Sequence, residues 1–291
     1  MDEQDWAILL KLYEEKSITK AAEVLFISQP ALTARIKQIE DRFAAQIVIR
    51  GRKGVHFTPE GKYLVERARE MSQKMHIIEG AIWTMRNEVK GLLRIGASNY
   101  FTGHKLPELL RQFQARYPDV EFKVVTNDSR KIVDLIINHD IDVCFVHGKF
   151  EWSGMEDLLL EENMFLVSTN EIRVADLPKT TWINYTTSKP IWDMLDTWWK
   201  DNFSQPPHVG MEVNTVDSCI RMIMKGLGYG FLPEGVLDYT EKAYKIKMID
   251  RQGEPLKRPT WMFYHEDSLK ITLVKTFVDF VKGLDIRSIS L

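Results

Sequence analysis

The chain has 291 residues, of which 44% are hydrophobic and 27% charged, and its formal net charge is −2. This composition is typical of a globular protein of about two domains and argues against a disordered, fibrous or globally basic chain. Two cysteines are too few for a disulfide scaffold, and no signal peptide or stretch of membrane-spanning length is evident. We therefore expect a cytoplasmic protein without a membrane partner.

The N-terminal residues predict two short helices joined by a tight turn. Helical spacing of Trp6, Leu9 and Tyr13 indicates a first helix that ends near Lys16. Ser17 can cap the second helix, in which small side chains such as Ala21 permit close helix packing. We expect Phe26 and Ile27 to fill the turn that follows.

A third helix is predicted from Gln29 to about Phe43, capped by Ser28 and opened by a proline. Its apolar residues Leu32, Ile36 and Ile39 define one buried face. The other face is suited to reading DNA, because short side chains near the start of a helix can reach base edges and basic ones can hold phosphate. The predicted contacts in this region are Ser28, Gln29, Ala31, Thr33, Arg35 and Lys37.

The segment after this helix predicts a β-hairpin, because two short apolar runs at 47–49 and 55–57 flank a Gly-Arg-Lys-Gly turn. We expect Arg50, Arg52 and Lys53 to contact phosphate or the minor groove. A single basic residue is more often a solvated surface charge. Residues 29–58, however, hold six basic residues against two acidic ones, and this local excess favours a DNA-binding wing.

The sequence from Ser17 to Gly61 resembles the N-terminal signature of LysR-type transcriptional regulators. Eleven residues stand where that pattern expects them: Ala21, Ala22, Leu25, Ser28, Gln29, Pro30, Ile36, Glu40, Arg50, Thr58 and Gly61. Thr33 replaces the usual serine, and Ile47-Val48 replace a Leu-Phe pair. Ala44 stands where a helix-ending glycine is usual, so the left-handed turn there is either absent or slightly strained.

Residues 59–90 predict a long linker helix that begins at Thr58-Pro59-Glu60 and could run to Glu88. Apolar residues recur along it at alternating spacings of four and three, which favours a coiled coil over a helix packed only on its own domain. The expected dimerisation residues are Leu64, Met71, Met75, Ile78, Ile82 and Met85. A dimer would recognise an imperfect palindrome in double-stranded DNA, and the family resemblance implies that tetramers are common.

From residue 92 onward, predicted strands and helices alternate, which indicates doubly wound α/β lobes. Predicted helices cover 103–116, 129–138, 190–203, 215–226 and about 268–283. The resemblance implies a two-lobed effector domain over 91–291, similar to periplasmic binding proteins, whose chain crosses between the lobes twice. We place the crossings near 161–164 and 264–268, so lobe one is 92–162 with 267–291 and lobe two is 163–266. With a winged helix-turn-helix over 1–58, the fold class is multi-domain α+β.

Ligands of such α/β lobes bind at the carboxyl ends of the strands, beside helix N-termini. This rule selects as effector-binding candidates Ser98, Asn99, Thr126, Asn127, His147, Thr186, Ser188, Asn214, Thr215 and Arg258. A single Ser, Thr or Asn at such a place is more often a helix cap. The segments around His147 and Arg258 resemble those of citrate-responsive catabolite regulators, which tend to carry Arg at both positions. The histidine weakens the case for a tricarboxylate and leaves a smaller or less charged anion, such as a simple carboxylate, as the effector.

No catalytic residue set, metal-ligand spacing or cofactor motif is apparent, so we expect no enzyme activity, metal or cofactor. Three alternatives remain at this point. The protein could be a DNA-binding regulator without a sensor, a regulator that responds to oxidation of Cys144 or Cys219, or a solute-binding or enzymatic α/β domain fused to a DNA-binding head. The two predicted lobes disfavour the first, and neither cysteine lies in a clearly electropositive neighbourhood.

Overall fold

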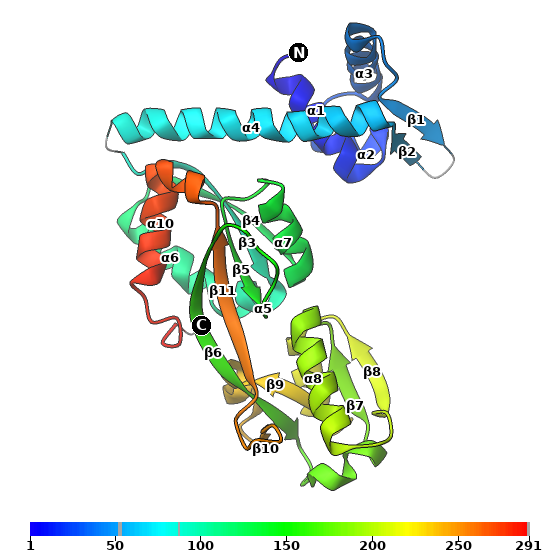
Figure 1. The fold of residues 1–291 in the computed structure, drawn as a ribbon, viewed down its shortest axis with the longest axis vertical. Helices are drawn as coiled ribbons and strands as arrows, with labels where there is room; N and C mark the ends of the chain where they lie inside the picture. The colour runs from blue at the N-terminus through cyan, green and yellow to red at the C-terminus, as the bar shows by residue number, and fades with distance from the viewer. Residues whose placement is uncertain (52–53, 87, 290–291) are drawn as a thin grey trace. The chain divides into compact units, whose positions relative to one another are not determined.

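The computed structural model describes residues 1–51, 54–86 and 88–289. The chain divides into two compact units (Figure 1). The N-terminal unit comprises Met1–Ile82 with Asn138–Asp140, and the C-terminal unit comprises Trp83–Ile137 and Ile141–Leu291. Within the residues described, no helix combines the length and apolar character needed to span a membrane.

Three capped helices form the N-terminal unit: α1 (Glu3–Glu15), α2 (Ile18–Val24) and α3 (Gln29–Phe43). Asp2, Ser17 and Ser28 each accept a hydrogen bond from a backbone N–H three residues further on, as helix caps do. The first helix ends at Lys16, as the sequence predicted. The core between the helices includes Leu9, Leu12, Ala21, Ala22, Leu32 and Ile36.

Four described non-glycine residues in this unit, Lys16, Phe26, Ala44 and His139, adopt left-handed backbone conformations, and two of them bear on the sequence predictions. Phe26 has φ 54° and its side chain is 96% exposed, so the prediction that Phe26 fills the turn is wrong. This conformation points the ring to solvent, while Ile27 packs on the core. Ala44 has φ 47° and ends α3, so the left-handed turn is present and carries the strain that a glycine would avoid, roughly 1 kcal/mol.

A hairpin and a long helix complete the N-terminal part. Strands β1 (Val48–Gly51) and β2 (Gly54–Phe57) pair antiparallel, which agrees with the predicted wing. Helix α4 (Pro59–Met85) begins where the sequence predicted but ends three residues before Glu88. The hydroxyl of Thr58 caps it by accepting a hydrogen bond from the Gly61 amide at 3.0 Å.

A nine-stranded mixed sheet runs through the C-terminal unit in the order β4-β3-β5-β11-β6-β9-β7-β8, with β10 paired to β6. Strands β3–β5 and β7–β9 are parallel within their own groups. Strand β11 pairs antiparallel with β5 and β6, and β6 pairs antiparallel with β9. The strand bounds are β3 (Gly91–Ser98), β4 (Val120–Asn127), β5 (Val143–His147), β6 (Met155–Ser168), β7 (Trp182–Tyr185), β8 (Val209–Val213), β9 (Tyr229–Pro233), β10 (Tyr244–Lys247) and β11 (Lys257–Tyr264).

Helices cover both lobes of this sheet. They are α5 (Asn99–His104), α6 (Leu106–Arg116), α7 (Ser129–Ile137), α8 (Lys189–Asn202), α9 (Val216–Ile223) and α10 (Thr272–Lys282), with short 3-10 helices η1 (Val174–Lys179), η2 (Glu234–Thr240) and η3 (Glu266–Lys270). The helix predicted over 103–116 is divided at Lys105 into α5 and α6. Pro107 explains the division, because proline fits the first turn of a helix and disrupts its interior.

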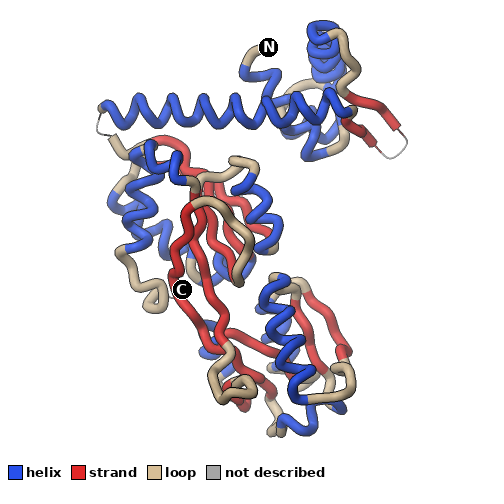
Figure 2. The backbone as a smooth tube through the Cα atoms, in the orientation of Figure 1, coloured by secondary structure: helices blue, strands red, loops and turns tan. Residues whose placement is uncertain are grey.

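Strands β6 and β11 connect the two lobes as a pair of long strands (Figure 2). Residues 155–163 of β6 pair with β11 and residues 164–168 pair with β9, so β6 changes its pairing partner at 163–164. The second crossing was predicted too late. Residues Thr260–Tyr264 pair with β5 of lobe one, so the chain leaves lobe two at about 256–259 rather than 264–268. An apolar strand carries no signal of which lobe it joins.

Candidate functional site

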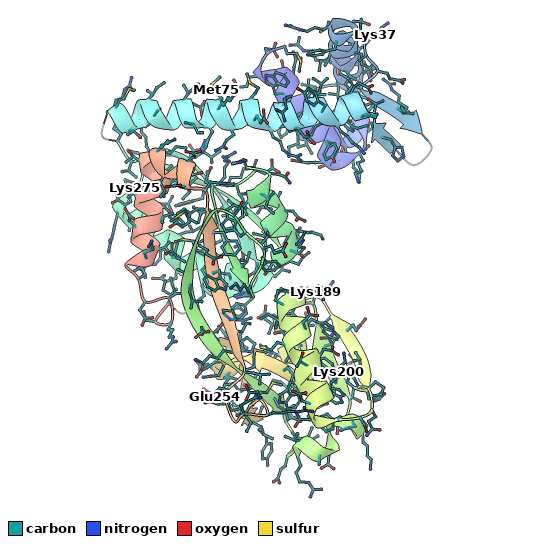
Figure 3. All side chains as sticks on the ribbon, viewed as in Figure 1. Lys37, Met75, Lys189, Lys200, Glu254 and Lys275 are labelled. Carbon is teal, nitrogen blue, oxygen red and sulfur yellow. The ribbon has the colours of Figure 1, made fainter. Side chains whose placement is uncertain are left out.

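The recognition surface is the outward side of α3. Leu32, Ile36 and Ile39 are buried and fix the orientation of the helix. Ser28 is exposed and its hydroxyl accepts a hydrogen bond from the Ala31 amide at 3.3 Å. Of the other predicted DNA contacts on this helix, Gln29, Ala31 and Lys37 are exposed and Thr33 is half-buried; Lys37 stands on the outside of the unit (Figure 3).

Arg35 is held differently from its neighbours on α3. Its guanidinium forms ion pairs with Asp2 and with the buried Asp5, the Nε–Oδ1 distance to Asp5 being 2.5 Å. This pairing holds the pKa of Asp2 below its ordinary value. Two carboxylates therefore occupy donors that the sequence assigned to phosphate, and Arg35 ties α3 to the start of α1.

The backbone of the wing is held by hydrogen bonds at both of its strands. Glu40 of α3 accepts hydrogen bonds from the amides of Ile47 and Val48 at 2.8 and 3.2 Å. The Val55 amide donates to the Lys16 carbonyl at 2.8 Å. Arg50 is exposed on β1, whereas Arg52 and Lys53 lie outside the described residues and stay predictions.

Along α4, the predicted dimerisation residues divide into two groups. Met71, Met75, Ile78, Ile82 and Met85 are between 41% and 83% exposed in the single chain, and Met75 is visible on the outside of the helix in Figure 3. Leu64 is only 8% exposed and belongs to the N-terminal core. Leu64 is therefore corrected to a core residue, because the first turns of α4 pack on α1–α3.

The C-terminal unit buries a charged pair where β6 and β11 cross between the lobes. Glu162 and Arg258 face each other in the strand register and form an ion pair. The other carboxylate oxygen of Glu162 accepts hydrogen bonds from the Tyr100 hydroxyl at 2.7 Å and the Gly235 amide at 3.1 Å. The Arg258 guanidinium lies 3.8 Å from the centre of the Tyr100 ring, a cation–π contact.

His147 lies beside this pair at the carboxyl end of β5. Its Nδ1 is 2.9 Å from the Thr260 hydroxyl, and its ring packs edge-on against Tyr100. Burial, together with the nearby charge of Arg258, holds the pKa of His147 well below its ordinary value. The imidazole is therefore neutral at pH 7.

Three polar atoms at this place are buried and have no hydrogen-bond partner among the described residues: Arg258 Nε, His147 Nε2 and Ser188 Oγ. Ser188 stands at the N-cap of α8 but makes no capping hydrogen bond with its side chain. A Cβ atom added to Gly148 would lie 3.2 Å from the Ser188 hydroxyl oxygen. The Gly148 amide itself donates a hydrogen bond to the Pro259 carbonyl at 3.0 Å. Ser188 therefore lies close to Gly148, the residue that follows His147.

The remaining predicted effector residues have local roles or are exposed. Ser98 caps α5 and Thr215 caps α9. The Thr126 hydroxyl lies 3.1 Å from that of Thr102, and the Asn127 side chain accepts from the Asp128 amide. Thr186 Oγ1 donates to the Val213 carbonyl at 3.5 Å, and Asn99 and Asn214 are exposed. The structure thus brings His147 and Arg258 together, places Ser188 beside the neighbouring Gly148 and leaves these seven outside that group.

Sequence reasoning missed four residues that build the site: Tyr100, His104, Glu162 and Thr260. His104 Nε2 lies 3.2 Å from Asp217 of α9, which links the lobes on another side of the junction. Burial lowers the pKa of His104, although Asp217 opposes the shift. The sequence offers no signal that singles out Glu162, because β6 carries three other acidic residues, Glu156, Asp157 and Glu161.

Neither cysteine is suited to redox chemistry. Cys144 and Cys219 are both fully buried. Burial raises the pKa of the Cys219 thiol to about 12 and that of Cys144 further, so both stay protonated and weakly nucleophilic. The redox-responsive alternative is not supported. Among the described residues, no cluster of three or more His, Cys, Asp or Glu side chains could hold a metal ion.

Both parts of the chain match models of known families. Residues 4–62 match the bacterial regulatory helix-turn-helix protein, lysR family. Residues 86–284 match the LysR substrate binding domain. YraN of Bacillus subtilis, an uncharacterised HTH-type transcriptional regulator, is 38% identical over 97% of this chain and 98% of its own length. YkuM of the same organism, also uncharacterised, is 28% identical over 98% of each chain.

Solved structures share the fold at low sequence identity. A full-length OxyR variant from Pseudomonas aeruginosa has a TM-score of 0.70 at 16% identity and covers 100% of this chain and 98% of its own. Full-length CbnR complexed with its target DNA has a TM-score of 0.64 at 17% identity, covering 97% of this chain and 99% of its own. The comparisons therefore span both the helix-turn-helix and the two lobes.

Proposed function

Because the chain belongs to the LysR family of DNA-binding transcriptional regulators, we propose that it acts on cytoplasmic DNA as a homodimer or a homotetramer, controlled by a small anion. The anion, such as a carboxylate, binds between the two lobes. It favours one arrangement of the protein because its affinity for that arrangement is higher.

One observation carries the ligand part of this proposal: Arg258 Nε, His147 Nε2 and Ser188 Oγ are buried without partners among the described residues at the lobe junction. A buried polar group without a partner costs about 1–3 kcal/mol. A ligand oxygen that accepts hydrogen bonds from such groups removes that cost. The three side chains come from β11, β5 and the start of α8, so a bound anion would contact both lobes at once.

The DNA part rests on the exposed side of α3 and on the apolar side of α4. Gln29 is suited to a base contact, while Lys37 and Arg50 are suited to phosphate. The exposed Met and Ile side chains of α4 form a seam that pairs with a second copy. Two reading helices then face two half-sites of an imperfect palindrome. CbnR, which shares the fold, has been solved with its target DNA.

Selection of random double-stranded DNA by the full-length protein tests the first part. We expect enrichment of an interrupted inverted repeat. Enrichment of a single unrepeated half-site would contradict a dimer that reads a palindrome.

A thermal-shift screen of the full-length protein against small carboxylates and amino acids tests the second part. A ligand at one hundred times its Kd should stabilise the folded state by about 2.7 kcal/mol. Arg258→Met should lose the shift, whereas Arg130→Met should keep it, since the Arg130 side chain is 67% exposed on α7. A ligand whose shift survives Arg258→Met would show that it binds elsewhere.

A further inference from the structure

Glu162 is fixed in place by groups from three elements. Arg258 of β11 pairs with one carboxylate oxygen, while Tyr100 of α5 and the Gly235 amide at η2 bond the other. The Glu162 side chain is only 7% exposed. Three donors hold the two carboxylate oxygens, so a change of the Glu162 rotamer would break three contacts at once.

Arg258 and Glu162 balance each other at the junction before any ligand arrives. Arg258 contributes one positive charge and Glu162 one negative charge, and His147 is neutral. Lys105 is the other buried cation nearby, and its Nζ donates to the Ile289 carbonyl at 2.5 Å. On the lobe-two side, the Asp217 carboxylate engages His104 and is 51% exposed, so water screens its charge. The junction thus supplies hydrogen-bond donors in excess of positive charge.

A buried ligand charge needs both donors and a compensating charge. Arg258 Nε, Ser188 Oγ and His147 Nε2 can donate to one carboxylate group, and the unshared part of the Arg258 charge can compensate it. A second carboxylate on the same ligand would meet Glu162, which already holds Arg258, and would raise the buried negative charge further.

We propose that Glu162 is the residue that sets the charge of the ligand: the site takes a molecule with a single carboxylate and rejects di- and tricarboxylates of the same size. This inference rests on the proposed function, because it assumes that an anion binds at Arg258. It assigns to Glu162 a selectivity role in addition to its structural pairing.

Titration calorimetry of the full-length protein at pH 8 tests this with matched probes. One series is butyrate, succinate and propane-1,2,3-tricarboxylate, and the other is benzoate and phthalate. In the wild type, the monocarboxylate of at least one series should bind at least tenfold more tightly than its di- or tricarboxylate counterpart. Glu162→Gln keeps the shape but removes the charge, and should reduce that ratio at least tenfold.

Glu234→Gln is the matched control. Glu234 is an exposed carboxylate that accepts from Asn163 near the same crossing, so its loss should leave the ratio unchanged. A wild type that prefers the dicarboxylate, or a Glu162→Gln ratio equal to that of the wild type, overturns the role of Glu162. If Arg258→Met still abolishes that dicarboxylate binding, the proposed function survives and this inference alone fails.

Binding of none of these probes to the wild type would overturn the inference together with the anionic effector. Circular dichroism checks the folding of Glu162→Gln. If that variant does not fold, the relative affinities of the wild type for the ligands of each series still test the inference. The charges at the junction predict the order of these affinities without any substitution.

Discussion

His147 illustrates how burial at one residue makes stability depend on pH. The pKa of the folded-state imidazole lies well below its ordinary value of 6.5, because burial and then Arg258 disfavour the charged form. The unfolded chain therefore binds a proton more readily than the folded one as the pH falls. The stability that the neutral His147 side chain contributes is fully present above pH 6.5, and this contribution decreases as the pH falls below that value.

We expect the free energy of unfolding of the C-terminal unit to fall as the pH is lowered from 7.5 to 5, because the unfolded chain binds a proton that burial disfavours at His147. Urea unfolding followed by tryptophan fluorescence measures it. His147→Gln should flatten the slope, while substitution of His208, which lies in a loop of lobe two, should not. The same slope in both variants would assign the pH dependence to other groups, such as the buried His104.

Gly148 has no space for a larger side chain. It has φ +88°, and a Cβ there would lie 2.8 Å from Pro190 Cβ of α8. Gly253 has nearly the same backbone, φ +87°, but a Cβ added there would meet no atom within 4 Å. Comparing alanine at the two positions therefore separates the steric contact between the lobes from backbone strain.

We expect Gly148→Ala to lower the free energy of unfolding by about 1–3 kcal/mol more than Gly253→Ala does, which is the usual cost of overpacking. Urea unfolding of the two variants measures the difference. Equal losses of unfolding free energy in the two variants would mean that α8 and the end of β5 can move apart to accept the extra methyl group at little energetic cost.

At the scale of elements, α3 is a reading helix whose contacts should separate into two kinds. Loss of Gln29, a base contact, should weaken DNA binding by about 1–3 kcal/mol at the selected sequence and much less elsewhere. Loss of Arg50, a phosphate contact on the wing, should weaken binding to all sequences evenly and reduce its salt dependence. Fluorescence anisotropy with Gln29→Ala and Arg50→Ala at several salt concentrations measures both effects. Unchanged binding in both variants would rule out this surface.

Helix α4 combines two roles, since its first turns join the N-terminal core and its later turns expose an apolar seam. Ile78 is 53% exposed in the single chain, so an aspartate there is tolerable in a monomer but not in a buried seam. We expect Ile78→Asp to be monomeric by light scattering. Ser72→Asp, also exposed on α4, should remain dimeric. A dimeric Ile78→Asp variant would contradict the seam.

At the scale of the whole molecule, local patterns predicted more than long-range contacts did. Caps at Ser17, Ser28 and Thr58 fixed helix starts, and strand–helix alternation predicted the two lobes, because these signals lie within a few residues of the element they specify. The second lobe crossing was misplaced since strand pairing between β11 and β5 joins segments more than one hundred residues apart.

The residues of the candidate site also differ in whether local sequence signals or long-range contacts identify them. His147, Ser188 and Arg258 were found because they stand at strand or helix ends, where ligands of α/β lobes bind. Glu162 and Tyr100 were missed because their roles come from pairing across β6, β11 and α5. Arg35 was assigned to phosphate because its ion-pair partners, Asp2 and Asp5, lie at the start of the chain. No residue close to Arg35 in the sequence indicates that pairing.

One consequence follows from the continuity of α4 between Ala68, which is fully buried in the N-terminal core, and Ile78 in the exposed seam. An uninterrupted helix fixes the angular phase between the reading head and the dimer axis, since each residue turns the helix by about 100°. One residue inserted after Met71 should turn the two heads out of phase and abolish binding to the selected palindrome without unfolding either core. Seven inserted residues, close to two full turns, should restore the phase and select a palindrome with a different gap between its half-sites.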